Sequence, residues 1–170
     1  RVLEALAATY DWTPKREVPG APAIALVRGE ASITLEPAGQ LELSGAPLFD
    51  IHATRAEMDA HIAELETVSK PLGLTWLGVG FHPFATVDEL PRVPKLRYPV
   101  MEQYLPTRGA RGLDMMKRTC TVQANMDFES EADAMRKLRV SLRLQPIITA
   151  MFSNSPWHEG QHRGRLGERA

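Results

Sequence analysis

Cysteine is almost absent from this sequence, which contains one, Cys120, among its 170 residues. A single thiol cannot form a disulfide within the chain, so a disulfide-stapled secreted domain is excluded. A structural zinc site built from several cysteines is excluded too, and the five histidines lack the paired spacing of metal ligands. This cysteine content suits a reducing compartment, and we expect a cytoplasmic protein.

The sequence also lacks an excess of charge of one sign. Twenty Lys and Arg residues stand against 21 Asp and Glu residues, which gives a formal net charge of −1. This balance provides no long-range attraction to nucleic acid or to an anionic membrane, so any phosphate contact must be local. No apolar run approaches the roughly 20 residues that span a bilayer, and the first residues lack the order of a signal peptide. We therefore expect no nucleic-acid partner and no membrane partner.

Two familiar nucleotide-binding motifs are missing as well. No Gly-x-x-x-x-Gly-Lys loop occurs, and Gly78-Val79-Gly80 is too short for a dinucleotide-binding fingerprint. A nucleotide site in this chain would therefore need another construction.

The sequence does have enough apolar residues for a core. Its hydrophobic content is 44%, and its length fits a single domain, residues 1–170. A helix is expected at residues 2–10, after which Pro14 and Pro19 should stop regular structure.

An antiparallel meander is expected next. Residues 23–27 form a short apolar strand candidate, and residues 31–36 alternate strictly between apolar and polar side chains. Gly29 lies in the turn between them. The alternation resumes at residues 40–44, beyond the Pro-Ala-Gly turn at 37–39, so all three segments predict neighbouring strands.

The middle of the chain predicts one long helix followed by a broken region. Residues 53–70 carry an apolar stripe at three-to-four spacing, which predicts a core-facing helix, with Met58, Ile62, Leu65 and Val68 in the stripe. Residues 74–81 favour a strand whose glycines permit close backbone approach. Residues 84–112 contain four prolines after Phe84 and are expected to be mostly loop, with a short helix around 98–104.

The clearest strand pattern is at residues 119–128, where polar and apolar side chains alternate without exception. Cys120 falls on the apolar face and is expected to be buried as a small hydrophobic residue. Ser130 begins a capping-box sequence, so a helix should follow, kinked or restarted at Pro146.

The polar face of residues 119–128 has two explanations. It is the solvated outer face of an antiparallel sheet, or it is a strand floor beneath a polar ligand. The absence of lysine and the short hydrogen-bonding side chains favour a ligand, and Arg118 stands at its entrance.

Two further groups of charged residues also have a functional and an ordinary explanation. Glu36 and Glu42 flank one bend and can offer oxygen ligands to Mg²⁺, or they are simply exposed strand glutamates. The arginines and lysine in or beside the proline-rich region can bind carboxylate or phosphate, or they are surface charge; they are Arg97, Arg108, Arg111, Lys117 and Arg118. We expect Arg108 and Arg111 to be surface charge.

Several segments together resemble the glutamate–cysteine ligase family of plants and many proteobacteria. They match in order and spacing over residues 18 to 160. They are Ser32-Ile33-Thr34-Leu35-Glu36-Pro37, Gln40-Leu41-Glu42-Leu43-Ser44-Gly45-Ala46-Pro47, Leu77-Gly78-Val79-Gly80-Phe81, Arg97-Tyr98, Gly112-Leu113-Asp114-Met115-Met116, Arg118-Thr119-Cys120-Thr121-Val122-Gln123, and Asn154-Ser155-Pro156.

The resemblance implies a fold and a reaction. The fold would be α+β and glutamine synthetase-like, with a curved, mainly antiparallel sheet and helices packed on its outer face. The reaction would use ATP and Mg²⁺ to join the side-chain carboxylate of glutamate to the amine of cysteine through a γ-glutamyl phosphate. This is the first step of glutathione biosynthesis, and a plant source would imply a plastid location.

The resemblance also implies roles for individual residues. Glu36 and Glu42 would hold Mg²⁺ or support its shell, and Arg97 and Arg118 would be catalytic arginines near substrate carboxylate or phosphate. The substrate or ATP contacts along the sheet floor would be Thr119, Thr121, Gln123 and Asn125.

The sequence departs from the usual family pattern at Ala38, at Leu41 and at Trp157-His158, none of which removes a polar site residue. The family's upstream acidic segment and its downstream pocket segments are not present in it. We therefore expect one partial catalytic domain, residues 1–170, of a longer ligase that is inactive in this form alone. A related carboxylate–amine ligase of the same fold, or a non-catalytic binding or regulatory remnant, stays open, as does the oligomeric state.

Overall fold

The structure is a computed structural model that describes residues 1–168. Its residues divide into two compact units. The first unit contains residues 1–78 and 87–117, and the second contains residues 79–86 and the chain from Arg118 onward. Each unit is described by itself.

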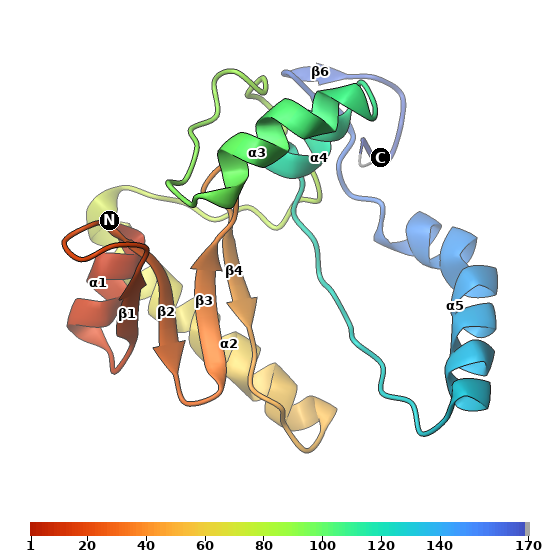
Figure 1. Cartoon of the computed structure of the whole chain (residues 1–170), viewed down its shortest axis with the longest axis horizontal. Helices are drawn as coiled ribbons and strands as arrows, with labels where there is room; N and C mark the ends of the chain where they lie inside the picture. Colours follow the sequence, from red (N-terminus) through yellow and green to blue (C-terminus); the bar gives the residue numbers. More distant parts are fainter. Residues whose placement is uncertain (169–170) are drawn as a thin grey trace. The chain divides into compact units, whose positions relative to one another are not determined.

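The first unit is built on a four-stranded antiparallel meander in the order β1-β2-β3-β4 (Figure 1). Its strands are β1 (Thr13–Arg16), β2 (Ala23–Arg28), β3 (Ala31–Leu35) and β4 (Leu41–Ser44). Gly29 (φ 58°) and Gly39 (φ 91°) adopt the left-handed conformation in the two turns of β2-β3-β4, as a residue without Cβ does at little cost. The predicted meander is confirmed.

Strand β1 corrects the expectation that Pro14 stops regular structure. Pro14 pairs with Leu26 of β2, and β1 is the first strand in the sheet order. Proline lacks an N–H donor, but an edge strand has one side without a ladder, so proline is tolerated there. The sequence pattern missed this strand because its four residues are all exposed and do not alternate in hydrophobicity.

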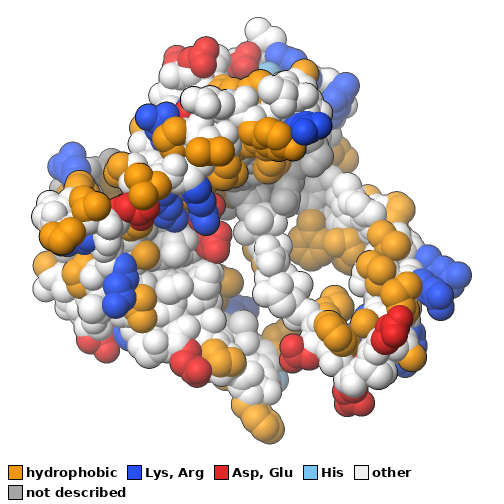
Figure 2. Space-filling view, in the orientation of Figure 1, with side chains coloured by type: hydrophobic (Ala, Val, Ile, Leu, Met, Phe, Trp, Pro, Cys, Tyr) orange, Lys and Arg blue, Asp and Glu red, His pale blue; other side chains and the backbone are white. Residues whose placement is uncertain are grey.

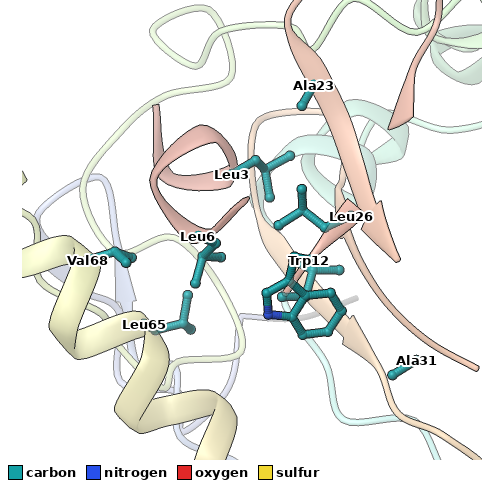
Figure 3. Close-up of a cluster of buried hydrophobic side chains, with 9 residues drawn as sticks. Leu3, Leu6, Trp12, Ala23, Leu26, Ala31, Leu65 and Val68 are labelled. Atoms are coloured by element: carbon teal, nitrogen blue, oxygen red, sulfur yellow. The ribbon is translucent and has the colours of Figure 1, made fainter. Parts of the chain in front are cut away.

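Two helices, α1 (Val2–Thr9) and α2 (Ile51–Ser69), pack on one face of this sheet. Figure 3 shows the side chains that meet between the helices and the strands. The core cluster comprises Leu3, Leu6, Trp12, Ala23, Leu26, Ala31, Ile33, Leu65 and Val68. Asp50 caps α2 through its side-chain oxygen, which accepts the backbone N–H groups of His52 and Ala53.

Only part of the predicted apolar stripe of α2 is core. Leu65 and Val68 are buried, whereas Met58 and Ile62 are 41% and 46% exposed. The buried residues of α2 all lie in its second half, from His61 to Ser69. Helical periodicity identifies a face, but the length of that face that is covered depends on the neighbouring elements.

A second small cluster of the first unit joins Val93, Tyr98 and Met116. Tyr98 belongs to α3 (Arg97–Tyr104), which confirms the short helix expected there. Met116 belongs to α4 (Gly112–Arg118), a helix that the sequence pattern did not indicate. Two single turns complete the unit, η1 (Lys70–Leu72) and η2 (Leu105–Thr107).

The second unit contains the long helix α5 (Glu131–Phe152) and a hairpin of β5 (Trp157–His158) and β6 (Gln161–His162). The Ser130 hydroxyl accepts the backbone N–H of Asp133, which confirms the predicted cap. The helix runs through Pro146 without restarting. None of its residues is buried, and Figure 2 shows hydrophobic side chains along it.

The strands expected at residues 74–81 and 119–128 are not formed within the described chain. Their only pairing there is one antiparallel bridge, between Phe81 and Thr119. A strand is held by a ladder of hydrogen bonds to a neighbour, and alternation alone does not supply that neighbour. Cys120, expected to be buried, is exposed for the same reason.

None of the helices within residues 1–168 combines the length and the apolar character that a membrane span requires.

Candidate functional site

The sheet of the first unit has a polar face opposite its core face. The register pairs Ser32 with Ser44 and Thr34 with Glu42, and the Glu36 N–H donates to the carbonyl oxygen of Gln40. Because paired residues project to the same side of an antiparallel sheet, Glu36 and Glu42 share this face. The two carboxylates predicted as metal ligands are therefore placed on one surface.

Cations lie beside Glu36. Its Oε1 is 3.9 Å from Lys95 Nζ and 3.9 Å from Arg97 Nη2. These separations are those of loose ion pairs rather than direct hydrogen bonds. Glu36 and Arg97, two of the predicted site residues, are thus neighbours, whereas Lys95 carries no sequence signal that singles it out.

Arg97 is anchored through the buried Tyr98. Its Nη2 donates to the Tyr98 hydroxyl at 3.3 Å, and that hydroxyl donates to the Leu35 carbonyl at 3.4 Å. The Arg97 guanidinium also lies 5.1 Å from the centre of the Tyr98 ring. Yet the Arg97 side chain is 62% exposed, so its remaining donors face solvent at the end of β3. This arrangement suits an arginine that receives an anionic group.

Glu42 has few contacts. The Ser44 hydroxyl donates to its Oε1 at 3.3 Å, and the side chain is exposed. An exposed carboxylate that accepts one long side-chain hydrogen bond can also bind a ligand.

The acidic residues can form part of a metal site but not a complete cage. Residues 1–168 contain no group of three or more His, Cys, Asp or Glu side chains placed to hold a metal. Glu36 and Glu42 occupy diagonal cross-strand positions, which are roughly 7–8 Å apart. Mg²⁺ is commonly bound by one or two carboxylates together with waters and substrate phosphate. The two glutamates fit that partial role.

Two polar residues of the first unit, Gln40 and Lys117, hold it together through hydrogen bonds to backbone carbonyl oxygens. Gln40 accepts the Ala38 N–H and donates to the carbonyl oxygens of Met116 and Lys117, which ties the β3-β4 turn to the end of α4. Lys117 Nζ donates to the carbonyl oxygens of Val87 and Leu90. Lys117, for which the sequence allowed either an anion-binding role or surface charge, is not a surface residue, because only 9% of it is exposed.

Arg118 belongs to the second unit and is its most enclosed charged residue among those described. Its side chain is 1% exposed, and Nη1 donates to Glu159 Oε1 at 3.1 Å. The guanidinium lies 4.5 Å from the centre of the Phe81 ring, which stacks on His158 at 5.6 Å. Sequence reasoning singled out Arg118 but missed these partners, since only chain folding brings residues 81 and 159 beside it.

The polar residues that follow Arg118 lie on an extended segment that is exposed from residue 120 onward. Thr119 forms the bridge to Phe81, and the Gln123 side-chain amide donates to Asn125 Oδ1 at 3.0 Å. Asn125 also lines a groove of about 510 Å³ between this segment and α5. The structure therefore brings Glu36 and Arg97 together in the first unit, and Gln123 and Asn125 together in the second.

Comparison with known proteins gives a family for the chain. The sequence profile of Glutamate-cysteine ligase family 2 matches residues 6–170. The chain is 47% identical over 169 residues to the chloroplastic glutamate–cysteine ligase of Brassica juncea and 48% identical over 169 residues to that of Nicotiana tabacum. The enzyme of Arabidopsis thaliana is 47% identical.

These alignments cover 99% of this chain and 32% of each of the three relatives. The chain thus spans about a third of the length of the curated relatives that it matches. A profile match across nearly the whole chain is far more specific than any single motif, and the chain belongs to Glutamate-cysteine ligase family 2.

Proposed function

We propose that the full-length protein carrying this chain is an ATP-dependent glutamate–cysteine ligase that performs the first step of glutathione biosynthesis. The γ-phosphoryl group of ATP passes to a side-chain carboxylate oxygen of glutamate, and ADP leaves. The cysteine amine then attacks the acyl carbon, phosphate departs, and the amine loses a proton. The observation that carries this proposal is the family match over residues 6–170.

The polar face of the first unit supports a phosphoryl-transfer role. Catalysis of this kind depends on positioning and on charges that meet the transferring group. Arg97 offers exposed donors beside Glu36, and Glu42 stands on the same face with an uncommitted carboxylate. We assign Arg97 to a substrate carboxylate or phosphate, and Glu36 and Glu42 to the support of a metal.

Magnesium, when bound there, would neutralise charge on the nucleotide phosphates. The chain's own contribution is to hold two carboxylates on one rigid sheet face. Lys95 and Arg97 offset the charge of Glu36 at 3.9 Å, which limits repulsion between that carboxylate and an approaching phosphate.

We further propose that residues 119–128 complete a glutamine synthetase-like sheet in the full-length protein. Their strict alternation and the exposed apolar side chains Val122, Met126 and Phe128 are typical of a strand with one buried face. Arg118, Thr119, Thr121, Gln123 and Asn125 would then line the substrate or ATP pocket, and residues 1–170 would be one part of a single catalytic domain.

Glutamate, cysteine and ATP are the partners that follow from this function. The three relatives compared above are named as chloroplastic. We propose a plastid location if the source is a plant and a cytoplasmic location if it is a bacterium.

The test is turnover by the full-length protein. ATP hydrolysis should require both glutamate and cysteine, and the product should be γ-glutamylcysteine by mass spectrometry. Glu42→Gln should lower kcat by about tenfold or more, because the metal site loses one charged oxygen. The unfolding midpoint should stay unchanged, since within residues 1–168 the Glu42 side chain is exposed and accepts one hydrogen bond, from Ser44.

Glu30→Gln is the matched control, because Glu30 is an exposed glutamate in the same meander, at the β2-β3 turn. It should retain wild-type activity. Turnover with another amine in place of cysteine would identify a related carboxylate–amine ligase instead. Absence of any ATP-dependent ligation would favour a binding or regulatory remnant.

A further inference from the structure

The turn between β5 and β6 places a glutamate where glycine or asparagine is preferred. Glu159 has φ 53°, and among residues 1–168 it is the only residue other than glycine with a positive φ. Gly160 follows with φ 75°, so both residues of this two-residue turn are left-handed, as in a type I′ hairpin. Such a turn favours Asn-Gly, and a glutamate there needs another reason.

The reason lies in the contact between Glu159 and Arg118. The Glu159 carboxylate accepts a hydrogen bond from Arg118 Nη1 at 3.1 Å, and the Arg118 side chain is 1% exposed. A guanidinium so thoroughly removed from water needs a counter-charge, and Glu159 provides one. The Gly160 N–H donates to the Pro83 carbonyl at 3.0 Å, which fixes the turn beside the segment that carries Phe81.

The backbone of Arg118 is held by that same segment. The His82 N–H donates to the Arg118 carbonyl at 2.7 Å, and the Cys120 N–H donates to the Gly80 carbonyl at 3.0 Å. Three contacts therefore hold Arg118: backbone hydrogen bonds, the packing of its guanidinium on the Phe81 ring, and the hydrogen bond to the Glu159 carboxylate. Its guanidinium and the start of the polar segment at Thr119 are oriented together.

We propose that Glu159 is a positioning residue of the ligase reaction, which fixes Arg118 and thereby the start of the polar segment at Thr119. This rests on the proposed function. Glu159 acts through Arg118 and does not contact the reacting atoms. A polar segment whose start is already fixed loses little conformational freedom when substrate binds, so the bound geometry is reached at lower cost.

Three variants of the full-length protein test the role of the Glu159 carboxylate. Glu159→Asn removes the carboxylate but suits a left-handed turn, so the hairpin itself should fold as well as before. It should lower kcat/KM by about 10- to 100-fold, with the KM of glutamate or of ATP raised selectively. Glu159→Asp retains the charge and should recover part of that loss. Glu129→Asn, at an exposed glutamate of the same unit, should have no effect.

A double-substitution cycle shows whether the effect passes through Arg118. In an Arg118→Lys background, Glu159→Asn should lower kcat/KM by a further factor of less than about three. The oriented guanidinium is already absent from that background. Equal losses in both backgrounds would overturn the proposal, as would an asparagine variant with wild-type kcat/KM. Glu159→Gln keeps the length of the side chain and replaces Glu159→Asn if the latter does not fold.

Hydrogen exchange separates this proposal from the proposed function. In Glu159→Asn the amides of His82 and Cys120 should exchange faster, because the contacts that hold Arg118 are weakened. If wild-type protein forms no γ-glutamylcysteine, the proposed function fails, and faster exchange still supports the hold of Glu159 on Arg118. Unchanged exchange together with unchanged kinetics would overturn the positioning role while leaving the ligase assignment intact.

Discussion

Arg97 and Arg118 carry the same charge in opposite surroundings. The Arg97 side chain is 62% exposed at the end of β3, whereas that of Arg118 is 1% exposed and paired with Glu159. Exposure leaves Arg97 free to adjust to an arriving ligand at the cost of side-chain entropy. Enclosure fixes Arg118 in advance but makes it dependent on its partner. Two arginines with similar sequence signals are thus suited to different tasks.

His61 is the residue from which a pH dependence of stability is expected. It is 6% exposed on α2, and its Nδ1 has no hydrogen-bond partner within the described chain. Burial lowers the pKa of His61 below its ordinary value, which Arg28 also lowers, while Glu64 and Glu57 raise it. The unfolded chain therefore binds more protons than the folded chain between the lowered pKa and the ordinary value near 6.5.

The free energy of unfolding should consequently be highest above about pH 6.5 and fall as the pH drops below that value. Urea unfolding at pH 7.5 and 5.5 measures the difference. His61→Leu should reduce this loss, because a proton no longer binds preferentially to the unfolded chain at this position. His52→Gln, at an exposed position of the same helix, should keep the wild-type difference. Equal pH dependence in all three proteins would contradict the role given to His61.

At the scale of elements, the start of α4 is packed against η2 without space for a side chain. A Cβ on Gly112 would lie 2.8 Å from the carbonyl oxygen of Leu105 and 3.0 Å from its carbonyl carbon. These are backbone atoms, which cannot rotate away. A Cβ on Gly109 would meet nothing within 4 Å.

Gly112→Ala should therefore lower the free energy of unfolding by about 1–3 kcal/mol, since the backbone of η2 must shift. Gly109→Ala should be neutral or stabilising by up to about 1 kcal/mol, because alanine restricts the unfolded chain. Chemical denaturation of both variants provides the comparison. Similar stability of the two would show that α4 does not sit against η2 in this way.

Helix α5 has the apolar composition of a buried helix but is exposed in this structure. Its apolar residues are exposed, and its arginines at 136, 139 and 143 follow one another at three-to-four spacing. A helix that is apolar over most of its circumference is typical of a protein interior. We expect α5 to be covered in the full-length protein, together with the apolar face of residues 119–128.

At the scale of the whole molecule, the backbone of residues 121–128 should differ between this chain and the full-length protein in its rate of hydrogen exchange. Within residues 1–168 the amides of this segment make no hydrogen bond to another backbone group. In the 170-residue chain these amides should exchange with solvent nearly as fast as in an unfolded peptide. In the full-length protein they should be protected by a factor of about 100 or more if the segment joins a sheet.

Hydrogen exchange followed by mass spectrometry measures both forms. Strands β2 and β3 are the internal reference, because they are paired within the first unit and should be protected in either form. Equal, fast exchange of residues 121–128 in the full-length protein would contradict the sheet assignment, and with it the pocket roles of Gln123 and Asn125.

The sequence by itself determined the features that depend on near neighbours. The β2-β3-β4 meander follows from period-two alternation and two turn glycines, and the start of α5 follows from the Ser130 cap. The family resemblance also came from the residues alone, because motif order and spacing survive without coordinates. These signals depend on residues close together in the sequence, so they can be found without coordinates.

Only the tertiary structure decided which distant residues meet. Lys95 and Arg97 lie beside Glu36, and Phe81 and Glu159 enclose Arg118, although some 40 to 60 residues of chain separate the members of most of these pairs. Tertiary surroundings also left residues 119–128 without a ladder, since a strand exists only where another backbone pairs with it. Contacts of this kind depend on the path of the chain through space, which periodicity does not encode.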